Sequence, residues 1–456
     1  MQRLKTENIM KQHFQYTLLL ALLVFTIKSK AQQNKLILLK NVNLIDGTGS
    51  VSKPNVDILI KDGNIAAIRS GLKEPAATQI DLKGKTIIPA IISAHTHIGT
   101  LKGNTSTAEN YTRENVLRQL KRYQDYGVGT ILTMGTDRPL IFEGLIDSIK
   151  AGLLPGARLY SAGYGFNTPE KAPGSWMNLL LRPESPEQVP AQIEQLAKVK
   201  PTVVKIWVDD HGGKADKMKP EIYKAIITEA HKKGIRVASH LYNLEDARDL
   251  TASGLDIMAH SIRDKEIDAD LLKSIKAKGV AYIPTLSLDE YAFVYARKPE
   301  WIEDPFFKAS LEPGVYEMII STKYQDQVKN SPDYERNMTG FKMALKNLKK
   351  IHDAGILVAL GTDSGAFPIR AQGFSEHLEM ELMVQAGLTP MQTITAATLN
   401  SAKILKIDNL YGTLEKGKKA DFIVLTESPE KNIKNTRKIE SVWKDGRKVS
   451  DGPLKK

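Results

Sequence analysis

The sequence predicts an α/β protein that combines a (β/α)8 TIM barrel with a small β-sandwich domain formed from both chain ends. Between Thr86 and Leu405, apolar runs alternate with amphipathic stretches of helical periodicity. Several of these stretches end at a glycine, as helix C-termini often do, at Gly234, Gly254 and Gly355. Repeated strand–helix units predict a parallel barrel ringed by helices. The eight strands expected from the apolar runs are residues 86–92, 129–134, 157–161, 202–208, 235–239, 256–259, 280–284 and 356–360.

The two ends of the chain carry a different pattern. Short strand-like runs there alternate with turn signals such as Asp46-Gly47, Asp62-Gly63 and Asp445-Gly446, which are typical of antiparallel β-structure. We expect residues 32–85 and 406–456 to pair into one small β-domain with a structural role. Residues 86–405 would then form the barrel.

Residues 1–31 are typical of a signal peptide. Lys11 precedes an apolar stretch at 16–27, and Ser29-Lys30-Ala31 fits a small-x-small cleavage site. The apolar stretch is short for a membrane span. We expect cleavage after Ala31 and export of the mature protein to the periplasm or the medium, without stable membrane insertion. An uncleaved anchor is the alternative.

Composition limits the function classes. Of the formal net charge of +12, the first 31 residues carry +4, and the remaining charge of about +8 is spread evenly along the chain. We interpret it as a mildly basic surface and expect no nucleic-acid partner. The sequence contains no cysteine, which excludes disulfides and a cysteine-linked lipid anchor. The expected partner is a small-molecule substrate, and homo-oligomerisation stays open.

The tripeptide His95-Thr96-His97 directly follows the first apolar run of the predicted barrel. Side chains two positions apart on a strand point the same way, so both imidazoles can bind one metal ion. Catalytic residues of such barrels gather at the carboxyl ends of the strands, where other polar residues also stand here. We therefore expect one site formed by His95, His97, Lys205, His240, His260 and Asp363.

Taken singly, these residues have ordinary alternatives. A lone histidine at a strand end is commonly a core or surface residue, a strand lysine can extend to solvent, and Asp363 can cap a helix. Their joint occurrence favours a metal site. Histidine and carboxylate ligands suit Zn²⁺, our first choice, and also Mn²⁺, Fe²⁺ or Co²⁺.

Lys205 needs its own explanation, because an ammonium group has no lone pair for a metal. Burial lowers the pKa of a lysine and frees the neutral amine. That amine can react with CO₂ to give a carbamate, an anionic two-oxygen ligand that can bridge two metals. The position therefore favours two divalent ions and a carboxylated Lys205.

These residues resemble the metal-dependent amidohydrolase superfamily, near its imidazolonepropionase-like and prolidase-like branches. The resemblance covers essentially all of the mature chain. Ala90 departs from the family's usual glycine, and Ser93 stands where Asp or Asn is common; neither is a ligand. The matching stretches are residues 88–97, 204–206, 361–365, 386–390, 396–402 and 412–422.

The resemblance implies a ligand set and a reaction. His95, His97 and Asp363 would hold the more buried metal, His240 and His260 the more exposed one, and carboxylated Lys205 would bridge both. The implied reaction is hydrolysis of an amide-like bond by a hydroxide between the metals, with Asp363 as general acid and base.

Substrate contacts are weaker expectations. Tyr242 is assigned a catalytic and substrate-binding role, holding the carbonyl oxygen, while Arg263 would bind a substrate carboxylate and His377 would line the mouth. Each has an ordinary surface or helix-start role as its alternative. The expected substrates are dipeptides or N-acyl amino acids; a cyclic amide, a lactone or an ester stays open.

Residues 287–337 form a long insertion rich in aromatic side chains. They predict a lid over the active face, with a cluster that packs on itself as the alternative. Two other function classes stay open. One is a glycosidase using Asp209, Asp210 or Glu290, although adjacent strand residues face opposite ways, so only one of the two aspartates can point inward. The other is a non-catalytic metal-binding barrel.

Overall fold

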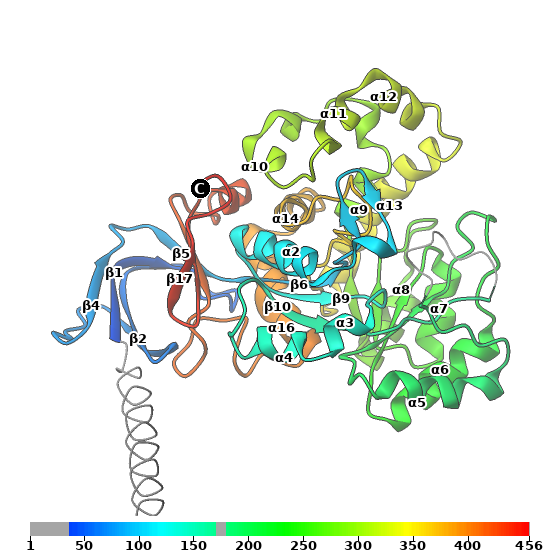
Figure 1. The fold of residues 1–456 in the computed structure, drawn as a ribbon, viewed down its shortest axis with the longest axis horizontal. Coiled ribbons are helices and arrows are strands. Elements are labelled where there is room, and N and C mark those ends of the chain that lie inside the picture. Colours follow the sequence, from blue (N-terminus) through cyan, green and yellow to red (C-terminus); the bar gives the residue numbers. More distant parts are fainter. Residues whose placement is uncertain (1–35, 170–178, 456) are drawn as a thin grey trace, which may run out of the picture.

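The computed structural model describes residues 36–169 and 179–455, which form a mixed α/β fold (Figure 1). The α/β class expected from the sequence is thereby confirmed. The proposed signal peptide at 1–31 lies outside the described residues. Within the described residues, no helix is both long and apolar enough to cross a membrane.

The two chain ends meet in one sheet. Its core buries Leu39, Val42, Ile58 and Phe422, and the Phe422 ring stacks on Trp443 at 5.3 Å between centroids. The strand order is β17 (Arg447–Ser450), β16 (Ile439–Lys444), β15 (Phe422–Leu425), β5 (Thr86–Pro89), β1 (Leu36–Leu44), β2 (Lys53–Lys61) and β3 (Asn64–Arg69), with β4 (Thr78–Asp81) beside β1.

The first strand expected for the barrel, residues 86–92, is divided between two sheets. Its first half is β5, which pairs with β15 and β1 in the sheet of the chain ends. The chain leaves that sheet at Pro89, which has no N–H to donate to a ladder. The next amide, Ala90 N, donates to Asp421 O, and Ile91 N donates to Gly127 O. The second half is a separate strand, β6.

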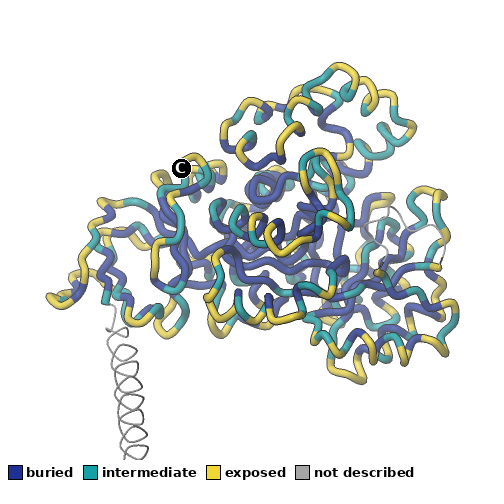
Figure 2. The backbone as a smooth tube through the Cα atoms, viewed as in Figure 1, coloured by how far each residue is buried: buried dark blue, intermediate teal, exposed yellow. Residues whose placement is uncertain are grey.

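Two parallel sheets carry β6 and the next six expected strands, from residues 129–134 to residues 280–284. One has the order β10 (Arg158–Ser161), β9 (Val128–Thr133) and β6 (Ile91–Thr96); the other has the order β11 (Val204–Trp207), β12 (Val237–His240), β13 (Ile257–Ala259) and β14 (Ala281–Ile283). These strands are almost wholly buried (Figure 2). That burial explains their uninterrupted apolar sequence.

The eighth expected strand, residues 356–360, is not a regular strand. Val358 makes only an isolated bridge to Tyr282 of β14. On its other side, Ala94 N of β6 donates to Leu360 O at 2.8 Å. Between β10 and β11, Phe166 likewise makes a single bridge to Ile206. These isolated links connect the two parallel sheets at both edges.

Helices lie between the strands and pack their apolar faces on them. In α6, Ile222, Ile226 and Ala230 recur at helical spacing and are buried. The helix ends just before Gly234, which adopts a positive φ of 70°. The helices are α2 (Arg113–Asp125), α3 (Pro139–Phe142), α4 (Leu145–Lys150), α5 (Val189–Ala197), α6 (Pro220–Lys232), α7 (Leu244–Ala252), α8 (Ala269–Lys278), α9 (Leu286–Tyr291), α10 (Pro305–Lys308), α11 (Val315–Ile320), α12 (Thr322–Lys329), α13 (Tyr334–Asp353), α14 (Phe374–Gln385), α15 (Pro390–Thr395) and α16 (Ser401–Leu405).

The insertion at 287–337 includes α10, α11 and α12, which stand together at one side of the molecule (Figure 1). Its aromatic side chains pack on one another. The Trp301 ring meets Tyr291, Tyr295 and Phe307 edge-on, at 4.7–6.1 Å between centroids, and also contacts Phe374 of α14. The aromatic side chains therefore pack on one another and on α14. Leu288, Asp289, Ala292 and Asn337 of the same insertion line the cavity described below, and a lid over the active face stays a prediction.

Candidate metal and active site

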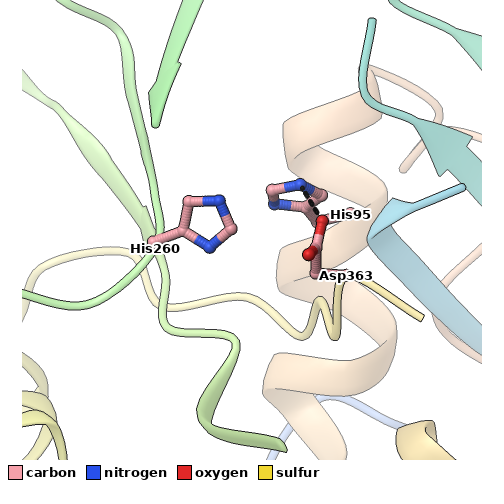
Figure 3. A group of neighbouring side chains, drawn as sticks. All are labelled: His95, His260 and Asp363. Atoms are coloured by element: carbon pink, nitrogen blue, oxygen red, sulfur yellow. Dashed lines mark ion pairs between the residues drawn. The ribbon is translucent and has the colours of Figure 1, made fainter. Parts of the chain in front are cut away.

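The structure brings four of the expected histidines and Asp363 together. Asp363 Oδ1 lies 3.1 Å from His95 Nε2 and 2.8 Å from His97 Nε2. The His260 ring lies 4.7 Å from that of His95 and 4.3 Å from that of His240, between centroids. Figure 3 shows Asp363 against His95, with the His260 ring facing both. Side chains from β6, β12 and the chain after β13 thus meet in one place.

Hydrogen bonds orient three of these imidazoles. Nδ1 of His97 bonds to Thr136 Oγ1 at 2.7 Å, and Nδ1 of His260 bonds to Thr285 Oγ1 at 2.8 Å. In His240 it is Nε2 that bonds, to Asp209 Oδ2 at 2.9 Å. Metal-ligating histidines usually bind the ion with one ring nitrogen and bond with the other. By that rule, Nε2 of His97, Nε2 of His260 and Nδ1 of His240 would be the nitrogens left for a metal ion.

Burial keeps the imidazoles of His95, His240 and His260 neutral. It lowers the pKa of His95 to about 3 and that of His240 to about 4, despite the carboxylate beside each, and it holds the pKa of His260 well below its ordinary value. A neutral imidazole has the lone pair that a metal ion requires. Nδ1 of His95 is buried without a hydrogen-bond partner among the described residues, while its Nε2 faces Asp363 Oδ1.

Lys205, in the middle of β11, is wholly buried, and its Nζ has no hydrogen-bond partner among the described residues. Burial lowers the pKa of this amine to about 7, although Asp363 opposes that shift. The charge of Lys205 also lowers the pKa of His95, His240 and His260. Gly135 makes room for this side chain, because a Cβ there would lie 2.9 Å from Lys205 Cβ.

Two glycines beside Asp363 allow its loop to approach His95 and His97 closely. A Cβ on Gly361 would lie 2.7 Å from His95 Cβ, and one on Gly365 would overlap the His97 carbonyl oxygen. Asp363 itself adopts a left-handed φ of 56°. Burial would raise the pKa of Asp363, but an ion pair with Arg370 and the two histidines hold it well below its ordinary value. The carboxylate is therefore ionised.

A cavity of about 300 Å³ opens over this cluster. Its polar walls include two ion pairs: Arg263 Nη1 to Asp289 Oδ1, at 2.8 Å, and Asp363 with Arg370. The lining residues are His95, His97, Trp207, Asp209, His211, His240, Tyr242, His260, Arg263, Leu288, Asp289, Ala292, Asn337, Gly340, Asp363, Ala366, Phe367 and Arg370.

The residues expected to contact substrate divide into two groups. Tyr242 and Arg263 line the cavity. His377 does not: it is wholly buried, with Nδ1 bonded to Thr436 Oγ1 and Nε2 to Tyr126 O, both at 2.9 Å. Its position at the start of α14 suggested exposure, but α14 is buried around most of its circumference. The assignment of His377 to the cavity mouth is therefore wrong.

Several site residues carry no strong sequence signal. Asp209 lines the cavity, while Asp210 caps its own loop by accepting from Gly212 N. Only one of the two adjacent aspartates thus lines the cavity, as expected. Asp209, His211 and His240 together offer three donor atoms within 4.8 Å of one another. Arg370, in the loop before α14, and Asp289, in α9, follow no recognisable sequence pattern.

Sequence comparison places the chain among hydrolases. It is 28% identical to ochratoxinase from Aspergillus niger over 240 residues, which is 51% of this chain and 42% of that protein. The chain thus spans well under two thirds of that relative. It is 25% identical to imidazolonepropionase from Thermoanaerobacter pseudethanolicus over 411 residues, covering 81% of this chain and 83% of the relative.

Solved structures share the fold. A structure described as a prolidase from Bifidobacterium longum superposes with a TM-score of 0.74 at 24% identity, over 92% of this chain and 96% of that one. A Xaa-Pro dipeptidase with methionine in its active site has a TM-score of 0.71 at 23% identity, over 91% and 99%. The fold thus defines a class, α/β proteins built like these two structures. Residues 86–449 match the Amidohydrolase family, and the chain belongs to it.

Proposed function

We propose that this protein is a metal-dependent amidohydrolase that cleaves the amide bond of dipeptides or N-acyl amino acids. The observation that carries the proposal is the buried amine of Lys205, which has no hydrogen-bond partner among the described residues and lies electrostatically coupled to His95 and Asp363. An amine buried without partners is costly unless it is neutral or modified. A carbamate formed there from CO₂ would remove the buried ammonium charge and supply two oxygens that can bridge two metals.

The donor set fits two divalent ions. His95, His97 and Asp363 would hold one, His240 and His260 the other, and carboxylated Lys205 would bridge both. The mixture of neutral imidazoles with carboxylate oxygens suits Zn²⁺. The second nitrogens of three histidines already have partners, which supports this use of the remaining nitrogens.

When bound, such ions supply a Lewis acid for the substrate carbonyl and activate water as a nucleophile at neutral pH. The chain's own residues supply the proton transfers. Asp363, ionised beside Arg370, would accept a proton from the attacking water and pass it to the leaving amine. The Tyr242 hydroxyl, in the cavity wall, would hold the carbonyl oxygen as negative charge develops on it.

We also infer the finer architecture. The isolated links of residues 358–360 to β14 and β6, and of Phe166 to Ile206, support closure of the two parallel sheets into an eight-stranded barrel. In that barrel the site would occupy the carboxyl ends of the strands. We propose residues 1–31 as a cleaved signal peptide, so that the enzyme acts after export.

Metal analysis of the purified mature protein, joined to a screen of dipeptides and N-acyl amino acids, tests this function. We expect about two divalent ions per chain, and turnover that a chelator removes and added Zn²⁺ restores. If only lactams, lactones or esters were hydrolysed, the proposed metal site would stand and the proposed substrate class would be wrong. Activity on glycosides that survives the chelator would contradict the proposal, as would bound metal without turnover on any amide or ester.

A further inference from the structure

Two guanidinium groups, those of Arg263 and Arg370, line the substrate cavity, and both are already paired. A third, that of Arg336, lies beside the lining residue Tyr242. Arg370 pairs with Asp363. Arg263 donates from Nη1 to Asp289 and from Nη2 to Leu241 O, at 2.7–2.8 Å. Arg336 differs, because none of the described residues places a carboxylate oxygen within 4.0 Å of it. It is thus a positive charge next to the cavity wall, behind Tyr242, that a ligand carboxylate can still neutralise.

The Arg336 side chain is held in place by packing. It belongs to the first turn of α13, and its Cζ lies 4.2 Å from the centre of the Tyr242 ring. On another side it lies against Gly212, where a Cβ would come within 2.6 Å of Nη1. An ion pair between Lys214 and Asp333 ties the loop of Gly212 to the start of α13. Cation–π stacking and close packing thus limit the rotamers of this arginine.

The Tyr242 ring joins Arg336 to the cavity. Tyr242 and Asn337, the neighbour of Arg336 in α13, both line the cavity. The Tyr242 hydroxyl lies close to Gly340 of the same helix, since a Cβ there would be 2.9 Å from it. A planar guanidinium fork beside a phenol is suited to carboxylate oxygens, which accept two parallel N–H bonds from arginine.

We propose that Arg336 binds the free carboxylate of the substrate and so selects N-acyl amino acids and dipeptides over their neutral C-terminal derivatives. This inference rests on the proposed function and names the residue that sets its substrate class. It replaces Arg263 in the role expected from the sequence, because Asp289 already neutralises Arg263. Arg263 then acts as support for the Tyr242 ring, from whose centre its Cζ lies 4.6 Å.

The test compares N-acetyl-L-amino acids with their C-terminal amides, with acetate release as the readout. The metal-loaded mature enzyme is measured as wild type, Arg336→Gln and Arg336→Lys, with Lys342→Gln as the control on an exposed position of the same helix. We expect wild type to prefer the acid by roughly tenfold or more in kcat/KM, as for a hydrogen-bonded charge. Arg336→Gln should remove most of that preference through KM of the acid alone, Arg336→Lys should keep part of it, and Lys342→Gln should keep all of it.

Two results would overturn the inference while leaving the proposed function intact. One is wild-type enzyme that cleaves acid and amide equally well. The other is an acid-to-amide ratio that Arg336→Gln leaves unchanged. If neither compound is cleaved, the proposed function fails instead, and calorimetric titration of the same two compounds decides the inference. Tighter binding of the acid that Arg336→Gln abolishes supports it, and equal binding overturns it.

Discussion

Asp363 and His97 are 266 residues apart in the sequence, and in the fold Asp363 Oδ1 lies 2.8 Å from His97 Nε2. The contact depends on the backbone as much as on the side chains. Gly365 lets the loop pass against the His97 carbonyl oxygen, and a left-handed φ at Asp363 turns the carboxylate inward. Arg370 on the other side keeps it ionised. The site is therefore assembled by a short glycine-flanked loop after residues 356–360.

Asp363→Asn removes the proposed proton carrier but keeps the size of the side chain. We expect a fall in kcat of roughly 10²–10⁴-fold, the usual contribution of a positioned acid or base, with little change in thermal unfolding. Steady-state kinetics of the metal-reconstituted variant measures it. Near-normal kcat in a variant shown to carry its full complement of metal would reject the role.

Asp209→Asn tests the hydrogen bond that orients His240. The Asp209 carboxylate bonds to Nε2 of His240 at 2.9 Å and so fixes the orientation of the imidazole. Loss of such a partner typically weakens metal binding by about 10–100-fold. We expect that loss only at the ion that His240 and His260 would hold, measured by competition with a chromogenic chelator. The neighbouring Asp210→Asn is the control, since the Asp210 carboxylate accepts from Gly212 N in its own loop and Asp210 is not among the described residues that line the cavity. Equal effects of both substitutions would argue against the orienting role.

Gly365→Ala probes the close approach of backbone to His97. A Cβ there meets both a φ of 86° and the His97 carbonyl oxygen, so we expect a loss in unfolding free energy on the order of 2–3 kcal/mol. Gly417→Ala is the matched control: its φ is 92° and a Cβ would meet nothing within 4 Å. The control should lose about 1 kcal/mol. Denaturant titration of the two variants compares the losses, and equal values would show that the contact is relieved elsewhere.

His377 should make stability depend on pH. Burial lowers its pKa from 6.5 to about 3, so between these values the unfolded chain binds a proton that the folded chain does not. Stability is therefore lost as pH falls below about 6.5, by about 1.4 kcal/mol for each pH unit. Between pH 6.5 and 5, wild type should lose about 2 kcal/mol more than His377→Gln. Parallel pH profiles for the two proteins, from denaturant unfolding, would contradict the assignment.

The sequence was most informative where strand geometry determines position. The spacing of His95 and His97 and the placement of Lys205 inside an apolar run were enough to predict that they are buried, because strand periodicity controls both. Features that depend on loops were not predictable. Nothing local shows that Arg370 turns back to Asp363, that residues 356–360 form bridges rather than a full strand, or that Pro89 moves residues 86–89 into another sheet. His377 misled because the burial of a helix start depends on what packs over it.

Anomalous diffraction at the zinc edge from crystals of the Zn²⁺-loaded enzyme, grown with bicarbonate, tests most directly whether Lys205 is a metal ligand. The account predicts two peaks, one by His95, His97 and Asp363 and one by His240 and His260, with added density on Lys205 Nζ between them. An unmodified Lys205 with no metal beside it, in crystals fully loaded with zinc, would contradict it.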